Sequence, residues 1–134
     1  MCYNNIMKTV FTNGCFDILH RGHLEYLKES AFWGERLIVG INSDSSIRKL
    51  KGSDRPINKE EDRKLALECL SFVDRVYIFD EPTPYELIKH IAPNLIVKGG
   101  DYTVETVVGH ELADVHIIPT VDGYSTTQII ENSK

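Results

Sequence analysis

Residues 10–23 read Val10-Phe11-Thr12-Asn13-Gly14-Cys15-Phe16-Asp17-Ile18-Leu19-His20-Arg21-Gly22-His23, and this stretch decides the fold. It begins as an apolar, β-prone run, turns at Asn13-Gly14 and ends in two histidines at the start of a helical pattern. A buried strand that turns into a helix is typical of phosphate sites, because the helix N-terminus offers unpaired N–H groups and a partial positive charge. His20 and His23 can add hydrogen bonds to phosphate oxygens.

The composition indicates one ordinary globular domain. The 134 residues are 42% hydrophobic and 26% charged, and the net charge of −5 argues against nucleic-acid binding, which needs a basic surface. No apolar run approaches the roughly 18 residues of a membrane span. Residues 1–7 lack the apolar centre of a signal peptide, so we expect a loose N-terminal leader. Three cysteines (Cys2, Cys15 and Cys69) lack metal-like spacing and indicate reduced thiols in a cytoplasmic protein.

Strand-like and helix-like segments alternate from residue 8 onward. Apolar runs predict strands over 8–12, 36–42, 74–79, 94–98 and 114–119. Periodicity predicts helices over 22–33, 43–47, 59–70, 82–90 and 125–130, a weaker helix over 104–112 and a loop over 49–58. The alternation predicts an α/β fold: a doubly wound, five-stranded parallel sheet with helices on both faces, in one domain over 8–134. Ligands then bind at the strand-to-helix corners 12–23, 42–45, 98–101 and 119–126.

The histidine pair is the first candidate site. At i and i+3, His20 and His23 share one face near the helix start, where they could bind phosphate and stabilise charge during its transfer. They could equally be structural or merely exposed, although Gly22 between them favours close approach of a ligand. A metal pair lacks a third ligand at a fixed spacing. Asp17 either orients a histidine or caps the turn.

A basic segment is the second candidate. Residues 48–64 hold seven cations against four acids, a local charge of +3 in an acidic chain. Such a run is usually a solvated surface, but cations in a loop beside a phosphate site can close over a triphosphate. Lys51 is the first choice within this segment.

Two further corners carry polar residues. Lys98-Gly99-Gly100-Asp101-Tyr102 is either a plain turn or a place where a nucleotide approaches the backbone, with Asp101 accepting a hydrogen bond from a hydroxyl or a base amine. Gly123-Tyr124-Ser125-Thr126-Thr127 is by default a helix cap, and is also suited to hold a phosphate or a ribose.

These four stretches together resemble the nucleotidyltransferase superfamily with its His-x-Gly-His signature and cytidylyltransferase-like, Rossmann-like fold. Gly-Ile-Asn-Ser-Asp (40–44), Leu-Lys-Gly (50–52), Arg-Pro-Ile-Asn (55–58), Val-Lys-Gly-Gly-Asp-Tyr (97–102) and Gly-Tyr-Ser-Thr-Thr (123–127) narrow the resemblance. They resemble the D-glycero-β-D-manno-heptose 1-phosphate adenylyltransferases over about residues 7–132. In many relatives a ribokinase-like sugar kinase precedes this domain, and this chain resembles the stand-alone form.

The resemblance implies a reaction in which ATP and heptose 1-phosphate, with Mg²⁺, give ADP-heptose and pyrophosphate for lipopolysaccharide or related glycan synthesis. It implies that His20, His23 and Lys51 are catalytic, and that the nucleotide pocket comprises Cys15, Phe16, His20, His23, Gly99, Asp101, Tyr124, Ser125, Thr126 and Thr127. Candidates for binding a substrate phosphate are Lys49, Arg55 and Arg63. It also implies a homodimer, while metal ligands stay unknown.

Two other functions stay open. Cytidylyltransferase relatives often carry an arginine shortly before the final Ser-Thr run, whereas Thr120-Val121-Asp122 here has no cation, which favours adenine over cytosine. A cytidylyltransferase acting on glycerol 3-phosphate or another small phosphate is still an alternative. A nucleotide-binding module without catalysis is the second.

Overall fold

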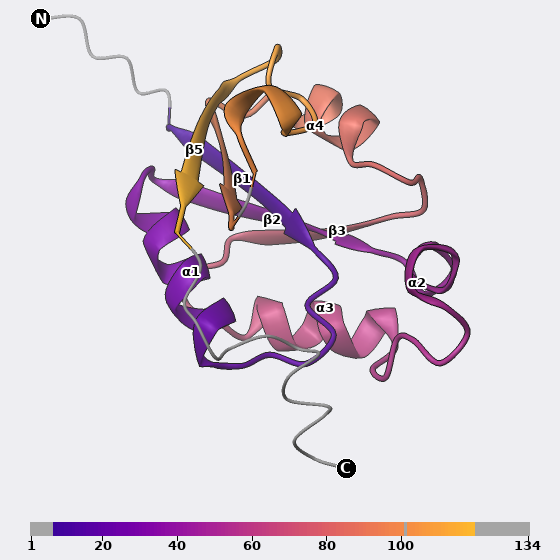
Figure 1. Cartoon of the computed structure of the whole chain (residues 1–134). Helices are drawn as coiled ribbons and strands as arrows, with labels where there is room; N and C mark the ends of the chain where they lie inside the picture. Colours follow the sequence, from indigo (N-terminus) through magenta and orange to yellow (C-terminus); the bar gives the residue numbers. More distant parts are fainter. Residues whose placement is uncertain (1–6, 101, 120–134) are drawn as a thin grey trace, which may run out of the picture.

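Five parallel strands form one sheet in a computed structural model that describes residues 7–100 and 102–119 (Figure 1). The order across the sheet is β3-β2-β1-β4-β5. The strands are β1 (Thr9–Gly14), β2 (Arg36–Asn42), β3 (Arg75–Phe79), β4 (Leu95–Gly99) and β5 (Asp114–Ile118). The helices are α1 (Arg21–Phe32), α2 (Asp44–Lys51), α3 (Glu60–Glu68) and α4 (Tyr85–Ile91), with one 3₁₀ turn, η1 (Val104–Thr106).

A separate apolar core lies on each face of the sheet. Leu27 of α1 and Leu67 of α3 pack with Val10, Val39 and other strand residues on one face. On the other face, Ile88 of α4 packs with Phe11, Ile38, Ile96 and Val107. Figure 1 shows α1 and α3 below the strands and α4 above them. The predicted doubly wound α/β sheet is therefore confirmed, because alternate residues of β1 and β2 face opposite cores.

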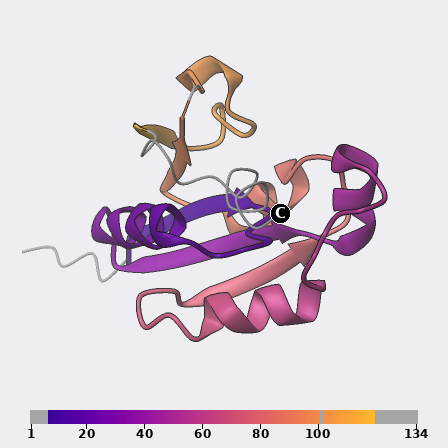
Figure 2. The ribbon, with the colours of Figure 1, turned by 60° about the horizontal axis from the view of Figure 1, so that its bottom comes forward.

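The strand order places a topological switch point beside the central strand. The chain runs outward from β1 through β2 to β3, and then returns to place β4 on the other side of β1. Figure 2 shows α3 lying along β3, and α2 at the end of the sheet toward which the strands point. Such a switch point opens a crevice at the carboxyl ends of the two strands that flank it.

Helix α2 is longer than the sequence predicts. The helix expected to end at Ile47 continues to Lys51, so Lys49 and Lys51 lie on a helix and not in a loop. The Ser43 side chain caps it by accepting a hydrogen bond from Ser46 N–H, and Ile47 anchors it in the protein interior. Cations in its last turn face the negative end of the helix dipole, which stabilises the extension.

The helix predicted over 104–112 is wrong. Only η1 forms there, and the chain then turns toward β5. Val107 leaves helical geometry because it packs into the second core, with 2% of its surface exposed. Gly109 has a φ of +88° and lies against Ile88 and Ile96, so packing overrides a weak helical pattern.

The helix predicted over 125–130 lies outside the described residues, as does almost all of the expected leader. Of the helices in the described part of the chain, none has the length and apolar character needed to cross a membrane.

Candidate active site at the carboxyl ends of β1 and β4

His20 is the N-cap of α1. Its Nδ1 accepts hydrogen bonds from the backbone N–H of Gly22 at 3.1 Å and of His23 at 3.4 Å. An imidazole nitrogen that accepts from two N–H groups carries no proton itself, so the proton of the neutral ring is on Nε2. Burial lowers the pKa of His20, which favours this neutral form. His20 therefore caps α1 through Nδ1 and carries its proton on Nε2.

His23 stacks on His20 one helical turn along. The ring centroids are 3.8 Å apart with 25° between the planes, and the Phe16 ring meets His23 edge-on at 5.2 Å. Burial lowers the pKa of His23 to about 4; the neighbouring His20 and the positive charge of Lys51 lower it too, against a hydrogen bond with the backbone of Ile18 that raises it. Two stacked neutral imidazoles can bind anionic oxygens without the mutual repulsion of two cations.

Phe16 holds a strained backbone position in the corner between β1 and α1. Its φ is +48°, in the left-handed region that bulky residues rarely adopt, and its side chain is buried. Such strain persists only where surrounding contacts impose it, and it collects at functional sites. The corner that leads into the histidine pair is therefore held in one conformation.

Asp17 holds the segment after α2 against this corner. Its buried carboxylate accepts hydrogen bonds from the backbone N–H groups of Ile57 and Asn58 and forms an ion pair of 3.1 Å with Arg55. The Asn58 side-chain amide also donates to the Asp17 carbonyl. The sequence offers two roles for Asp17, orienting a histidine or capping its own turn. These bonds match neither role, because the partners of Asp17 lie about 40 residues further along the chain.

Arg63 is buried, with 2% of its surface exposed. Its guanidinium donates to three backbone carbonyls, those of Cys15 (2.9 Å), Asn42 (2.8 Å) and Asn58 (3.0 Å). It also pairs with Asp44 at 2.9 Å. The arginine thereby ties the ends of β1 and β2 to the start of α2. Protein oxygens thus occupy four of its five N–H donors, and the expectation that Arg63 contacts a substrate phosphate stays a prediction.

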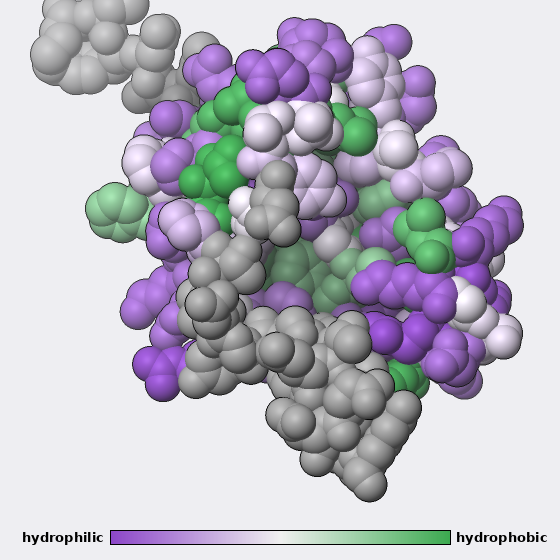
Figure 3. Space-filling model, viewed as in Figure 1, coloured by the Kyte–Doolittle hydropathy of each residue, from purple (hydrophilic) through white to green (hydrophobic). Residues whose placement is uncertain are grey.

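Lys49 and Lys51 are exposed on the last turn of α2, and Arg55 is half-buried just beyond it. Figure 3 shows hydrophilic side chains over this end of the molecule, with hydrophobic ones between them. Lys51 is close enough to His23 for its charge to lower the pKa of that ring. The structure thus brings the basic segment and the histidine pair to one place, as the sequence predicts.

Tyr26 of α1 reaches across the sheet between β1 and β4. Its hydroxyl donates to the Val97 carbonyl at 2.9 Å and shares a hydrogen bond of 2.6 Å with Thr12 Oγ1. Burial raises the pKa of Tyr26, so the hydroxyl stays protonated. A Cβ added at Gly99 would lie 3.2 Å from the Tyr26 ring, so this predicted nucleotide-binding glycine also has a packing reason to be small.

Lys98 opens the polar corner 98–102, where the sequence assigns no role to its own side chain. Its Nζ donates to Asn13 at the end of β1, 3.3 Å from the carbonyl oxygen and 3.4 Å from Oδ1. The sequence signals for this residue are its position at the carboxyl end of a predicted parallel strand and its place in the Val-Lys-Gly-Gly-Asp-Tyr motif.

Residues 11–132 match the cytidylyltransferase-like family. The chain belongs to that family. It is 56% identical over 125 residues to the "Bifunctional protein HldE" of Aliarcobacter butzleri, which covers 92% of this chain and 26% of the relative. The corresponding protein of Marinomonas sp. is 53% identical over 131 residues, covering 94% of this chain and 28% of the relative. The chain thus spans about a quarter of the length of these relatives.

A solved structure supports the same family. The crystal structure of the lipopolysaccharide core biosynthesis protein from Thermoplasma volcanium aligns with a TM-score of 0.72 and 31% sequence identity. The alignment covers 89% of this chain and 99% of that one. The family match and the structural alignment therefore indicate the same fold for this chain.

Parts of the predicted site of this cytidylyltransferase-like domain lie outside the described residues: Asp101, Tyr124, Ser125, Thr126 and Thr127. Cys15 lies at the corner, where its thiol donates to Asn42 Oδ1 at 3.8 Å and its carbonyl is held by Arg63. Among residues 7–100 and 102–119, no group of three or more His, Cys, Asp and Glu side chains is arranged to hold a metal ion.

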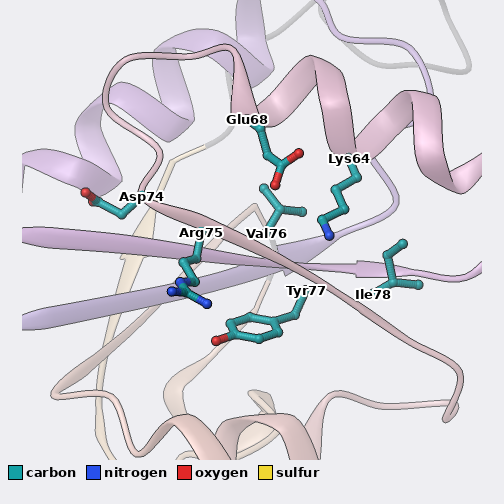
Figure 4. Close-up of a pocket in the computed structure, with 7 residues that line it drawn as sticks. All are labelled: Lys64, Glu68, Asp74, Arg75, Val76, Tyr77 and Ile78. Atoms are coloured by element: carbon teal, nitrogen blue, oxygen red, sulfur yellow. The ribbon is translucent and has the colours of Figure 1, made fainter.

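A separate hollow of about 300 Å³ lies along the edge strand β3, away from this site (Figure 4). It is bordered by α3 and β3 and lined by Lys64, Glu68, Asp74, Arg75, Val76, Tyr77 and Ile78. Its lining mixes opposite charges and brings together no reactive group, so the candidate active site stays at the switch point.

Proposed function

We propose that this chain is an adenylyltransferase that transfers AMP from ATP to D-glycero-β-D-manno-heptose 1-phosphate, giving ADP-heptose and pyrophosphate. One oxygen of the sugar phosphate attacks the α-phosphorus, and the bond from that phosphorus to the pyrophosphate oxygen breaks. The sugar phosphate is itself the nucleophile, so the protein has to position two anions and stabilise charge, and needs no nucleophilic side chain.

The observation that carries this proposal is the stacked histidine pair at the N-terminus of α1. Its rings are neutral near pH 7, and the helix dipole favours anions at this end of α1. Donors fixed before the reaction stabilise the charge that develops on the α-phosphate without further reorganisation.

The surrounding cations have distinct roles in this proposal. Lys51 and Lys49 approach the triphosphate from the exposed end of α2. Arg55 keeps one edge of its guanidinium on Asp17 while reaching toward the same anion. Mg²⁺ would enter with ATP, held chiefly by phosphate oxygens, which suits the described residues since they build no metal cage of their own.

The relatives support the substrate class. The Thermoplasma volcanium protein carries a name in lipopolysaccharide core biosynthesis, which fits a nucleotide-activated sugar as product. We further propose that Asp101 and residues 124–127 line the nucleotide pocket. We also propose that the protein works in the cytoplasm as a homodimer. Light scattering after gel filtration tests the dimer.

The test is a pyrophosphate-release assay on the purified chain with ATP and heptose 1-phosphate, with the nucleotide sugar identified by mass spectrometry. Replacing His20 or His23 with Ala is expected to lower turnover by roughly 10²- to 10³-fold, the range for losing one electrostatic transition-state contact. Lys28→Met, on the exposed face of α1, is the control and is expected to keep wild-type turnover.

Two results would redirect the assignment. Faster turnover of CTP with glycerol 3-phosphate than of ATP with heptose 1-phosphate would favour the cytidylyltransferase alternative, which agrees with the family's name. Tight ATP binding without pyrophosphate release for any acceptor would indicate a binding module. Near-normal turnover in both histidine variants would refute their catalytic role.

A further inference from the structure

Lys98 stands at the point where β1 and β4 separate. β1 pairs with β2 along its whole length but pairs with β4 at Val10 and Phe11, near its start. Beyond these pairs the Lys98 side chain bridges the two strands through its hydrogen bonds to Asn13. This is the switch-point crevice, where sheets of this kind bind their ligands.

Among the described residues, the ammonium group of Lys98 contacts neutral groups of Asn13 and Tyr102. It donates to the two Asn13 oxygens and lies 4.9 Å from the centroid of the Tyr102 ring. In the part of the chain that the structure describes, none of the ion pairs involves Lys98. Burial lowers the pKa of Lys98 to about 8, so the group is still mostly charged at neutral pH. A cation that is largely withdrawn from water gains energy when an anion binds beside it.

We propose that Lys98 binds the phosphate of the acceptor, the sugar 1-phosphate, and thereby helps to select this substrate. The proposal rests on the function given above. His20, His23 and Lys51 reach the crevice from the helices that follow β1 and β2, whereas Lys98 reaches it from β4, on the other side of the switch point. In an in-line transfer the acceptor and the leaving pyrophosphate lie on opposite sides of the α-phosphorus. Lys98 on one side of the crevice can therefore bind the acceptor phosphate, while the groups on the other side bind the leaving pyrophosphate.

Lys98 would keep its proton throughout the transfer. The acceptor oxygen forms its bond to the α-phosphorus while pyrophosphate leaves with the electron pair of the broken bond. The ammonium reduces the repulsion between two phosphate groups that must come into contact, and a lysine does this as a point charge. Its bonds to Asn13 hold the charge at the end of the central strand.

The test compares Lys98→Met, Lys98→Arg and the control Lys89→Met, which removes an exposed lysine on α4. For Lys98→Met we expect the KM for heptose 1-phosphate to rise about 10- to 100-fold, the range for losing one hydrogen bond to a charged group, while the KM for ATP changes by less than about twofold. Lys98→Arg should recover part of the loss. Lys89→Met should match the wild type in both constants.

Two outcomes overturn the proposal. An unchanged KM for heptose 1-phosphate in Lys98→Met, even with a lowered melting temperature, would make Lys98 a structural cross-link only. A rise confined to the KM for ATP would place it on the nucleotide. In either case the active wild type leaves the proposed function standing, whereas a wild type that forms no nucleotide sugar refutes the function, and the role of Lys98 with it.

Discussion

Replacing Arg63 with Met should be among the most destabilising single changes in this domain. The substitution keeps most of the side-chain volume but removes every donor of the guanidinium. The Cys15 and Asn42 carbonyls then lose their partner in the protein interior, and the Asp44 carboxylate, whose side chain is 23% exposed, loses its counter-charge. The Asn58 carbonyl belongs to an exposed residue, so water can replace the lost bond there.

The cost follows from these contacts. A buried acceptor left without a donor costs about 1–3 kcal/mol, and breaking a buried ion pair from one side costs about 3–5 kcal/mol in total. Asp44 regains some solvation, so we expect the free energy of unfolding to fall by about 3–5 kcal/mol. For a domain of this size that corresponds to a melting temperature lower by roughly 10–20 °C.

The assay is urea unfolding followed by circular dichroism, with thermal unfolding as a second measurement. Lys28→Met is the matched control, because it removes the same charge from an exposed helical position and should change stability by less than about 0.5 kcal/mol. Since Arg63→Met could consume most of the stability of a typical domain, Arg63→Lys is the second variant. Lysine keeps the positive charge but cannot donate to all three carbonyls at once, so the free energy of unfolding should fall by about half as much as in Arg63→Met. A loss below about 1 kcal/mol in Arg63→Met would refute the role assigned to this arginine.

Three further predictions concern the corner and its supports. Because the pKa of His23 is about 4 in the folded protein and near 6.5 ordinarily, the unfolded chain binds the proton more readily between these values, so stability falls as the pH drops through this window. Urea titrations of the wild type should show the free energy of unfolding fall between pH 7 and pH 4.5. In His23→Gln this fall should be smaller by about 1–2 kcal/mol, a figure that allows for the partial exposure of the ring. Equal falls in the two proteins would contradict the assignment. Tyr26→Phe should cost about 1–2 kcal/mol by leaving the Val97 carbonyl without its donor, and an unchanged urea midpoint would disprove this. Lys51→Met should raise the KM for ATP about 10-fold with little effect on melting temperature, because Lys51 is exposed, and an unchanged KM would exclude it from the triphosphate site.

The strands and the histidine corner could be predicted from the sequence because their signals are local. The near-continuous apolar run of residues 36–42 is long enough to indicate a strand covered on both faces, and β2 has those bounds. The Asn13-Gly14 turn and the two histidines predict the start of α1 within one residue of Arg21. The weaker helical pattern over 104–112 gave a wrong prediction, because packing in the second core decides the positions of Val107 and Gly109.

What the sequence by itself determined was the alternation of strands and helices, and with it the carboxyl ends of the strands as the place of the candidate site. Only the tertiary structure decided what each polar side chain does there. Asp17 meets Ile57 and Asn58, Arg63 meets Cys15, and Lys98 meets Asn13, pairs separated by about 40 to 85 residues. Periodicity and caps act over a few residues along the chain, whereas these contacts depend on strand order, which no local pattern encodes.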